Sequence, residues 1–231
     1  MIRLAALDMA GTTVDEGGAV YRALADAAGA ALGHPIAPDV LSRWMGMGKR
    51  EAVAGLLAGT PIDPEPVFAD FGARLAAAYD ATPPTALAGV EDAIAALRAS
   101  GVRVALTTGF GRDVAEGILD RLGWTVGETV DALVTVDDVS AGRPAPYLIF
   151  RAMEATGVLT PAEVAVAGDT VNDLRAGRNA GAAIVAGVLS GSQDAVTLGR
   201  EPHTHLLASV ADLPDVVSAS SRTAATASPR A

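Results

Sequence analysis

The sequence predicts an α/β protein: a doubly wound parallel-sheet core with a small helical cap domain inserted after the first strand. Short apolar runs bounded by turn residues alternate with longer segments of helical periodicity, which is typical of βαβ units around a buried parallel sheet. The interval between the first two runs is far too long for one crossover and shows helical stripes without a convincing strand. We expect the connections between the core strands to be right-handed.

The core elements follow from these patterns in chain order. Strands are expected at the apolar runs 2–7, 102–107, 132–136, 164–167 and 182–186. The helices between them, each with apolar residues at helical spacing, are expected at 90–99, 112–122, 146–156 and 172–179. Residues 1–16 and 86–215 are therefore assigned to the core domain.

Residues 17–85 are expected to form the helical cap. Apolar stripes at helical spacing pass through Val20 and Leu24, through Val53, and through Phe71. The stripe around Val20 and Leu24 would permit two copies of the chain to pair through their caps, although the same stripe could simply pack the cap itself.

Hinges and a tail complete the predicted organisation. Residues 15–18 and 81–87, the latter with two prolines, are expected to join the cap to the core. Residues 216–231 are expected to form a disordered tail, because the sequence from Ser218 onward is small and polar and has too little apolar surface to order itself.

Composition restricts the class of protein. The chain has 231 residues, a net charge of -10 and no cysteine, which excludes disulfides, thiolate metal sites and cysteine nucleophiles. The acidic balance without a basic run argues against nucleic acid as a partner. The longest uncharged stretch has 15 residues, fewer than a membrane span needs, and the first apolar run meets Asp8 too early for a secretory signal. We expect a cytoplasmic protein with no membrane partner.

Polar residues follow the predicted strands where each strand ends. Asp8 follows the first strand, Thr108 the second, and Asp169 the fourth, with Asp173 one helical turn later. Any one of them could be a helix N-cap or a turn residue. Three carboxylates that converge in a buried crevice would repel one another unless a cation neutralised them, and oxygen ligands suit Mg²⁺. The sequence therefore predicts a magnesium site.

Hydroxyl and glycine residues in the neighbouring loops favour a phosphoryl ligand. Thr12, Thr13, Thr108 and Gly109 lie in loops that open toward the same edge, and hydroxyls with free backbone N–H groups bind phosphoryl oxygens. Arg143 could balance the negative charge of the nucleophile and the phosphoryl oxygens, or it could be a surface arginine of an arginine-rich chain.

Four ordered segments resemble the motifs of a known family. They are DMAGTTVDE at 8–16, LTTGF at 106–110, GRPAP at 142–146 and GDTVND at 168–173. They resemble the haloacid dehalogenase superfamily, and specifically its phosphonatase branch, the phosphonoacetaldehyde hydrolases and phosphonatase-like hydrolases. The resemblance extends through the helical insert, which corresponds to the mobile cap of that family.

The resemblance implies roles for the core residues. Asp8 would be the nucleophile that attacks phosphorus and forms an aspartyl-phosphate. The Asp8 carboxylate and the Ala10 backbone carbonyl would bind Mg²⁺ together with Asp169, and Asp173 would support the metal site.

Binding of the transferred group follows from the same resemblance. Thr108 and the Gly109 N–H would hold the phosphoryl oxygens, with Thr12 nearby. Arg143 takes the place of the lysine or arginine in the third motif. The implied partner is a small phosphorylated or phosphonate substrate.

The sole lysine of the chain, Lys49, falls in the segment MGMGK, which resembles the cap loop of the phosphonatases. In that loop a Met-Gly pair, here Met45 and Gly46, precedes a lysine that forms a Schiff base with the substrate aldehyde. The electrons of the C–P bond then enter an enamine. Ala10, which cannot transfer a proton, stands where most phosphatases of the superfamily have an acid. Lys49 could instead begin a helix and steady a substrate anion.

Two positions depart from the phosphonatase pattern. Ala52 and Phe110 stand where that branch has a histidine and a tyrosine that transfer protons. Two further functions therefore stay open: a phosphomonoester phosphatase in which Lys49 is only an electrostatic contact, and a catalytically weak protein that binds a phosphoryl ligand.

Overall fold

The computed structural model describes residues 1–226, and its core is a six-stranded sheet in the order β5-β4-β1-β6-β7-β8. Every neighbouring pair in this sheet is parallel. The strands are β1 (Leu4–Asp8), β4 (Arg103–Thr107), β5 (Ala132–Val134), β6 (Val164–Gly168), β7 (Ile184–Val188) and β8 (His205–Leu207). This confirms the predicted α/β core with a parallel sheet.

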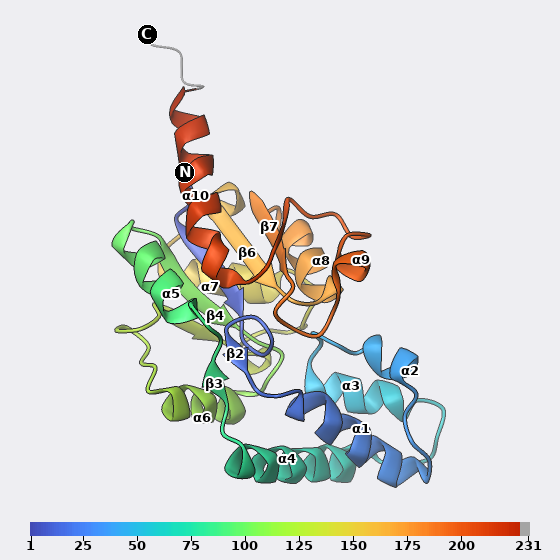
Figure 1. The fold of residues 1–231 in the computed structure, drawn as a ribbon. Coiled ribbons are helices and arrows are strands. Elements are labelled where there is room, and N and C mark those ends of the chain that lie inside the picture. The colour runs from blue at the N-terminus through green and yellow to red at the C-terminus, as the bar shows by residue number, and fades with distance from the viewer. Residues whose placement is uncertain (227–231) are drawn as a thin grey trace.

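Helices cover both faces of the sheet (Figure 1). In β1, Ala5 and Leu7 belong to one buried apolar cluster, and Leu4 and Ala6 belong to the other. This follows because successive side chains of a strand point to opposite faces. The cluster of Ala5 includes α5 (Val90–Ala99), α6 (Arg112–Leu122) and α10 (Leu213–Thr226), and the other includes α7 (Tyr147–Thr156), α8 (Val171–Ala180) and α9 (Ala195–Leu198).

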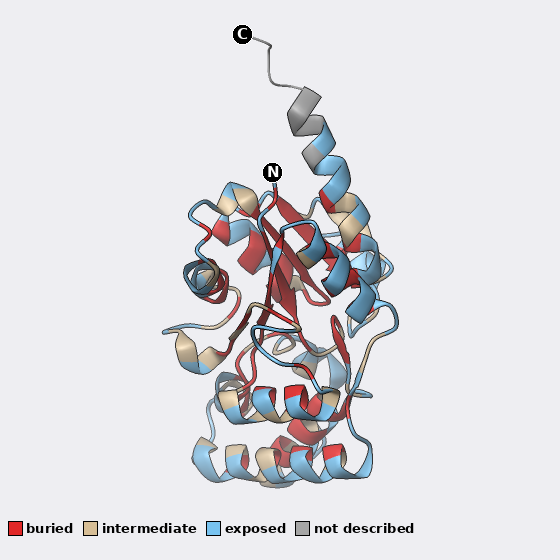
Figure 2. Ribbon diagram, turned by 90° about the vertical axis from the view of Figure 1, so that its left-hand side faces the viewer, coloured by how far each residue is buried: buried red, intermediate tan, exposed pale blue. Residues whose placement is uncertain are grey.

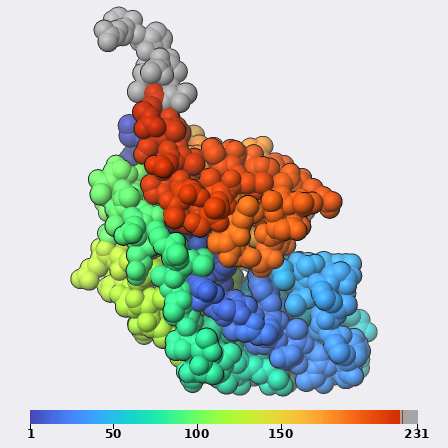
Figure 3. Space-filling view, in the orientation of Figure 1, coloured from blue at the N-terminus to red at the C-terminus, as the bar shows by residue number. Residues whose placement is uncertain are grey.

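The cap consists of four helices that follow β1 in the chain. They are α1 (Ala19–Leu32), α2 (Pro38–Ser42), α3 (Lys49–Leu56) and α4 (Pro64–Ala81). In Figure 2 the buried residues of the cap lie on the inner sides of its helices, while exposed residues cover the outer sides. Figure 3 shows the cap seated directly against the core. This confirms the predicted helical insert after the first strand.

Two short strands join the cap to the core. β2 (Val14–Asp15) and β3 (Thr85–Ala86) pair antiparallel, and the Leu87 N–H donates to the Thr13 carbonyl over 3.1 Å. The chain therefore enters and leaves the cap through one two-stranded ribbon, at the positions where hinges were expected.

The apolar stripe that could have paired two copies lies inside the cap. Val20 and Leu24 are 1% and 0% exposed in the single chain, and α1 packs against α4. These side chains therefore offer no surface to a second copy.

Three expectations need correction. Strand β5 ends at Val134 and not at residue 136, because Thr135 caps the short 3-10 helix Val136–Asp138. Strand β8, with three residues at the sheet edge, was not predicted because so short a run carries no periodicity. The tail expected from residue 216 was wrong for its first part, because helix α10 continues to Thr226 and buries Val217 against the core. Residues 227–231 of that predicted tail lie outside the described residues.

The remaining elements are the 3-10 helices Pro161–Glu163 and Val210–Asp212. Among residues 1–226, no helix has the length and apolar character needed to cross a membrane.

Candidate active site

Three strands bring the predicted site residues to one edge of the sheet. Asp8 ends β1, Thr108 follows β4, and Asp169 follows β6, with β1 lying between the other two strands. In an open parallel sheet, ligands bind beyond the carboxyl ends of the strands. The cap lies over this edge, so the site is the junction of the two domains (Figure 1).

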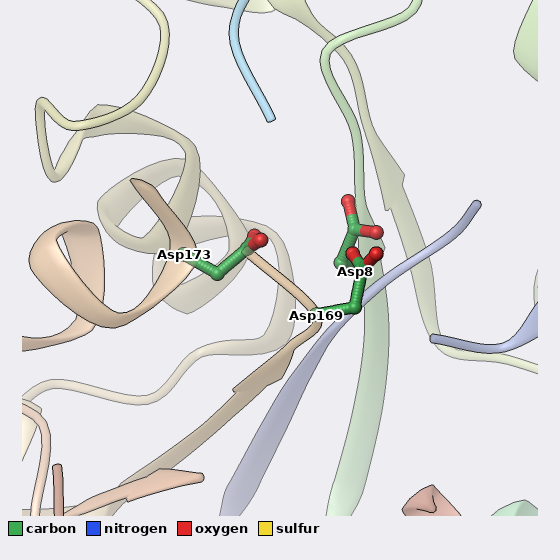
Figure 4. Close-up of side chains that lie close together, drawn as sticks. All are labelled: Asp8, Asp169 and Asp173. Atoms are coloured by element: carbon green, nitrogen blue, oxygen red, sulfur yellow. The ribbon is translucent and has the colours of Figure 1, made fainter. Parts of the chain in front are cut away.

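The carboxylates of Asp8, Asp169 and Asp173 converge at this junction (Figure 4). One carboxylate oxygen of each residue lies within 4.8 Å of one from each of the other two, and all three residues are buried. Burial, and secondarily the charge of Asp8, raises the pKa of Asp169 to about 6. Burial also raises the pKa of Asp173 to about 7, although the charge of Arg143 opposes the shift. Such a cluster is unfavourable as three anions without a cation.

Arg143 supplies one permanent positive charge. Its Nη1 donates to Asp8 Oδ1 over 2.6 Å, and its Nε lies 2.9 Å from Asp173 Oδ1. Its Nη2 donates to the carbonyl and the hydroxyl of Thr107 over 3.0 and 2.8 Å. Arg143 is only 5% exposed, so the interpretation as a surface arginine is wrong.

Local hydrogen bonds orient the other two carboxylates. Asp173 Oδ2 accepts the Thr170 N–H and hydroxyl over 3.1 and 2.5 Å, which forms a capping box at the start of α8. Asp169 Oδ2 accepts the N–H and the hydroxyl of Ser192, both over 2.7 Å. A Cβ on Gly191 would lie 2.2 Å from Asp169 Oδ2, so the loop after β7 needs glycine there.

Carboxylate oxygens arranged in this way fit a hard divalent cation. Mg²⁺ prefers oxygen ligands, and the Asp8 and Asp169 carboxylates line one cavity with Ala10, whose backbone carbonyl is a further oxygen. The two Ser192 contacts of Asp169 both use Oδ2.

The cap contributes Lys49, at the first position of α3. Its Nζ donates to the Met47 carbonyl over 2.9 Å and lies 5.4 Å from the Tyr21 ring centre and 5.6 Å from that of Phe110. Lys49 is 7% exposed, and this burial lowers its pKa to about 8, although the charge of Asp8 opposes the shift. An amine with this pKa is partly neutral near physiological pH.

The cap is closed on the core. Asn172 Nδ2 donates to the Met45 carbonyl over 2.7 Å. A Cβ on Gly46 would lie 2.2 Å from Thr170 Oγ1, and a Cβ on Gly109 would lie 2.6 Å from the Met47 carbonyl oxygen. The two glycines therefore permit an approach that larger residues would block.

The cavity between the cap and the core is small. Its volume is about 20 Å³, which is room for about one water-sized group. A substrate larger than this can enter only if the cap opens, and closure then excludes bulk water from the site. The cavity is lined by Asp8, Ala10, Val20, Tyr21, Gly46, Lys49, Thr108, Gly109, Phe110, Arg143 and Asp169.

The structure separates three predicted residues from this cavity. Asp173 lies behind Arg143 and does not line it. Thr12 is fully buried, and its hydroxyl has no hydrogen-bond partner among the described residues. Met45 contributes only its backbone carbonyl, to Asn172.

Sequence reasoning missed Tyr21, Asn172 and Ser192. Residues 190–192 come shortly after β7, which ends at Val188, and could have been noticed for that reason. Tyr21 carried no such signal, because it stands within a helix of the cap.

Stability should depend on pH through the two shifted carboxyl groups. Each folded-state pKa lies above the unfolded value of about 4, so between about pH 4 and pH 7 the folded protein binds more protons than the unfolded chain. The unfolding free energy of the metal-free protein should therefore fall as the pH rises through this window. Thermal unfolding of chelator-treated protein at several pH values measures this fall.

Mg²⁺ should restore the unfolding free energy that the metal-free protein loses at high pH. At 100 times its dissociation constant a bound ion adds about 2.7 kcal/mol, or about 5–10 °C in Tm. We expect this gain at pH 8 and a smaller one at pH 5, where binding must first displace protons. Na⁺ at equal ionic strength is the control. Equal gains at both pH values, or full activity of metal-stripped protein, would contradict the assignment.

Comparison with known proteins agrees with this site. A profile of the haloacid dehalogenase-like hydrolases matches residues 2–181. The chain is 39% identical over 110 residues to a phosphonoacetaldehyde hydrolase of Bacillus cereus (strain AH187), an alignment that covers 48% of this chain and 41% of that enzyme. It therefore spans less than half the length of that relative.

Solved structures show the same fold over nearly the whole chain. A hydrolase from Pseudomonas syringae superposes with a TM-score of 0.80 at 26% identity, covering 94% of this chain and 98% of that one. A phosphonoacetaldehyde hydrolase-like protein from Oleispira antarctica superposes with a TM-score of 0.83 at 19% identity, covering 99% and 96%. Because the profile matches most of the chain and contains the convergent carboxylates, this protein belongs to the haloacid dehalogenase-like hydrolases.

Proposed function

We propose that this protein is a Mg²⁺-dependent, phosphonatase-like hydrolase that transfers the phosphoryl group of a small organophosphonate to Asp8 and then to water. The observation that carries the proposal is that Asp8 and Lys49 line the same cavity of about 20 Å³. A nucleophile for phosphorus and an amine for a carbonyl group thus face one small substrate. The partial relatives named phosphonoacetaldehyde hydrolase support this choice.

Asp8 attacks phosphorus, and the other core residues stabilise the charge. Arg143 is held against Asp8 and balances the developing negative charge of the phosphoryl oxygens. Thr108 and Gly109 line the same cavity and would bind those oxygens. Asp8, Asp169 and the Ala10 carbonyl would hold Mg²⁺, which supplies charge neutralisation for the transferring group when bound.

Lys49 makes cleavage of a C–P bond feasible. Its neutral amine adds to the aldehyde of the substrate, and loss of one water gives an imine. When Asp8 attacks phosphorus, the electron pair of the C–P bond flows into the imine, which has taken a proton from solvent, and an enamine results. A proton is then added to the enamine carbon, and water hydrolyses the imine to release the aldehyde and regenerate Lys49. Water also hydrolyses the aspartyl-phosphate.

The test is to trap the imine. Borohydride added with phosphonoacetaldehyde should attach the substrate carbon chain to Lys49, which mass spectrometry can locate because the chain has no other lysine. Trapping should increase as the pH rises toward about 8, because the neutral amine is the reactive form. Lys49→Arg keeps the charge but cannot condense, so it should lose C–P cleavage by about 10³-fold or more.

The exposed Arg43 offers a matched control. Arg43→Lys adds a solvent-exposed lysine to the same cap, and the label should remain on Lys49. Equal labelling of both lysines, or wild-type turnover by Lys49→Arg, would contradict the Schiff base.

A phosphomonoester phosphatase is the second candidate. Ala52 is fully buried in the cap and Phe110 is apolar, so neither transfers a proton to an imine. Lys49 between two aromatic rings would then act as a cation toward a substrate anion. In that case Lys49→Arg hydrolyses its best phosphate ester at close to the wild-type rate. A protein that only binds phosphoryl ligands would release no phosphate from any substrate.

A further inference from the structure

We propose that the phenol of Tyr21, on helix α1 of the cap, is the acid that protonates the leaving oxygen when a phosphate ester transfers its phosphoryl group to Asp8. The inference rests on the phosphoryl transfer of the proposed function and not on the imine. The leaving oxygen needs a proton donor, which the core does not supply. An oxygen that leaves phosphorus without a proton is a poor leaving group, and the methyl side chain of Ala10 has no proton to give.

Tyr21 lies between the small cavity at Asp8 and a larger pocket beside it. It lines the small cavity together with Asp8, and it also lines an adjoining pocket of about 240 Å³. Ala10 and Asp169 are the other residues that line both spaces. A phosphoryl group at Asp8 with its leaving group in the larger pocket would therefore place the bridging oxygen beside Tyr21.

The phenol has a proton available. Tyr21 Oη accepts the Gly46 N–H over 3.1 Å, and its own O–H donates to no acceptor among residues 1–226. The Gly46 contact orients the hydroxyl on the closed cap without using its proton. Both residues belong to the cap, so the hydroxyl is oriented within the cap and comes to line the cavity of Asp8 when the cap lies on the core.

The other donors of the cavity are already engaged. Arg143 donates to Asp8 and Thr107. Lys49 donates to the Met47 carbonyl, and it lines the small cavity but not the larger pocket that would hold the leaving group. The Thr108 hydroxyl accepts the Phe110 N–H over 3.1 Å and would bind a phosphoryl oxygen. Tyr21 is therefore the donor of the cavity wall that the mechanism has left unused.

The step balances in protons and electrons. An Asp8 oxygen bonds to phosphorus while the bond from phosphorus to the bridging oxygen breaks, and that oxygen takes the Tyr21 proton to leave as an alcohol. In the second half, water attacks the aspartyl-phosphate and gives its proton to the Tyr21 phenolate. Asp8 and Tyr21 return to their starting states, and the products are an alcohol and phosphate.

The lining of the larger pocket defines the leaving groups to use. Asp15, Glu16 and Leu87 are among its residues, and no basic side chain is. A leaving group without negative charge fits this pocket best. Ethyl phosphate, whose ethoxide needs a proton, and p-nitrophenyl phosphate, whose phenolate leaves without one, form a suitable pair.

The experiment compares the two esters in wild type and Tyr21→Phe, which keeps the ring and removes only the hydroxyl. For ethyl phosphate, kcat/KM should fall by about 10²-fold or more, while for p-nitrophenyl phosphate it should stay within about threefold. Tyr79→Phe is the matched control, because it removes a buried cap hydroxyl that has no hydrogen-bond partner among residues 1–226 and lines neither space. This control variant should keep the wild-type kcat/KM for both esters.

Each outcome separates the two proposals. If Tyr21→Phe loses the same factor with both esters, the hydroxyl only anchors Gly46, and the inference is wrong while phosphoryl transfer stands. If Tyr21→Phe keeps the wild-type kcat/KM for both esters, Lys49 or solvent protonates the leaving group, and the inference is again wrong. If folded wild type releases phosphate from neither ester nor from a phosphonate, the proposed function fails and the inference fails with it.

Discussion

Replacing Asp8 by asparagine should abolish phosphate release, lowering kcat by about 10⁵-fold or more, because an amide oxygen cannot form the aspartyl-phosphate. The fold should survive the change. The amide side chain would keep an oxygen to accept the Arg143 Nη1, and it would remove one of three crowded negative charges from the site. The measurement is phosphate release under saturating Mg²⁺, with Tm recorded for the same preparation.

The matched control is Asp26→Asn. Asp26 lies exposed on α1 and lines neither the cavity nor the adjoining pocket, so its loss should leave turnover unchanged. Mass spectrometry must show that the asparagine introduced in place of Asp8 has not deamidated to aspartate. Near-normal turnover by a folded, deamidation-free variant would remove Asp8 from the mechanism.

Replacing Arg143 by methionine should cause the largest loss of stability. Arg143 joins Asp8 and Asp173 over 2.6 and 2.9 Å, and all three side chains are buried. Removing one partner from a buried ion pair leaves the other charge uncompensated and costs about 3–5 kcal/mol. Denaturant unfolding of metal-free protein at pH 8 should show this loss, and phosphate release should fall by about 10²–10³-fold.

Protonation of Asp173 should reduce the loss of stability caused by Arg143→Met. Without Arg143 the Asp173 carboxyl loses the charge that opposes its raised pKa, so more of it is protonated at pH 5 than at pH 8. The destabilisation should therefore be smaller at pH 5. Arg151→Met is the control, because Arg151 forms an exposed pair with Glu154 and should cost less than about 1 kcal/mol. Equal losses from both variants would show that Arg143 does not hold the carboxylates.

Local sequence patterns predicted much of the core. Helices α5 and α6 begin and end where the sequence placed them, and the end of α6 is set by Gly123, which takes the left-handed conformation typical of glycine after a helix. The convergence of Asp8, Thr108 and Asp169 was also predictable. The carboxyl ends of parallel strands share one sheet edge, so residues that follow separate strands must meet there.

The sequence by itself determined the αβ order, the helical insert and the carboxylate cluster, and it singled out Lys49 as the one lysine of the chain. The tertiary structure alone decided which neighbours complete the site: Tyr21 from α1, Asn172 on the Met45 carbonyl and Ser192 on Asp169. It also decided that Thr12 is buried and that the Val20 stripe faces inward. These outcomes depend on the closure of the cap and on how distant loops pack, which are contacts between segments far apart in the chain. Hydrophobic periodicity and strand-end position report only local structure, so they carry no information about such contacts.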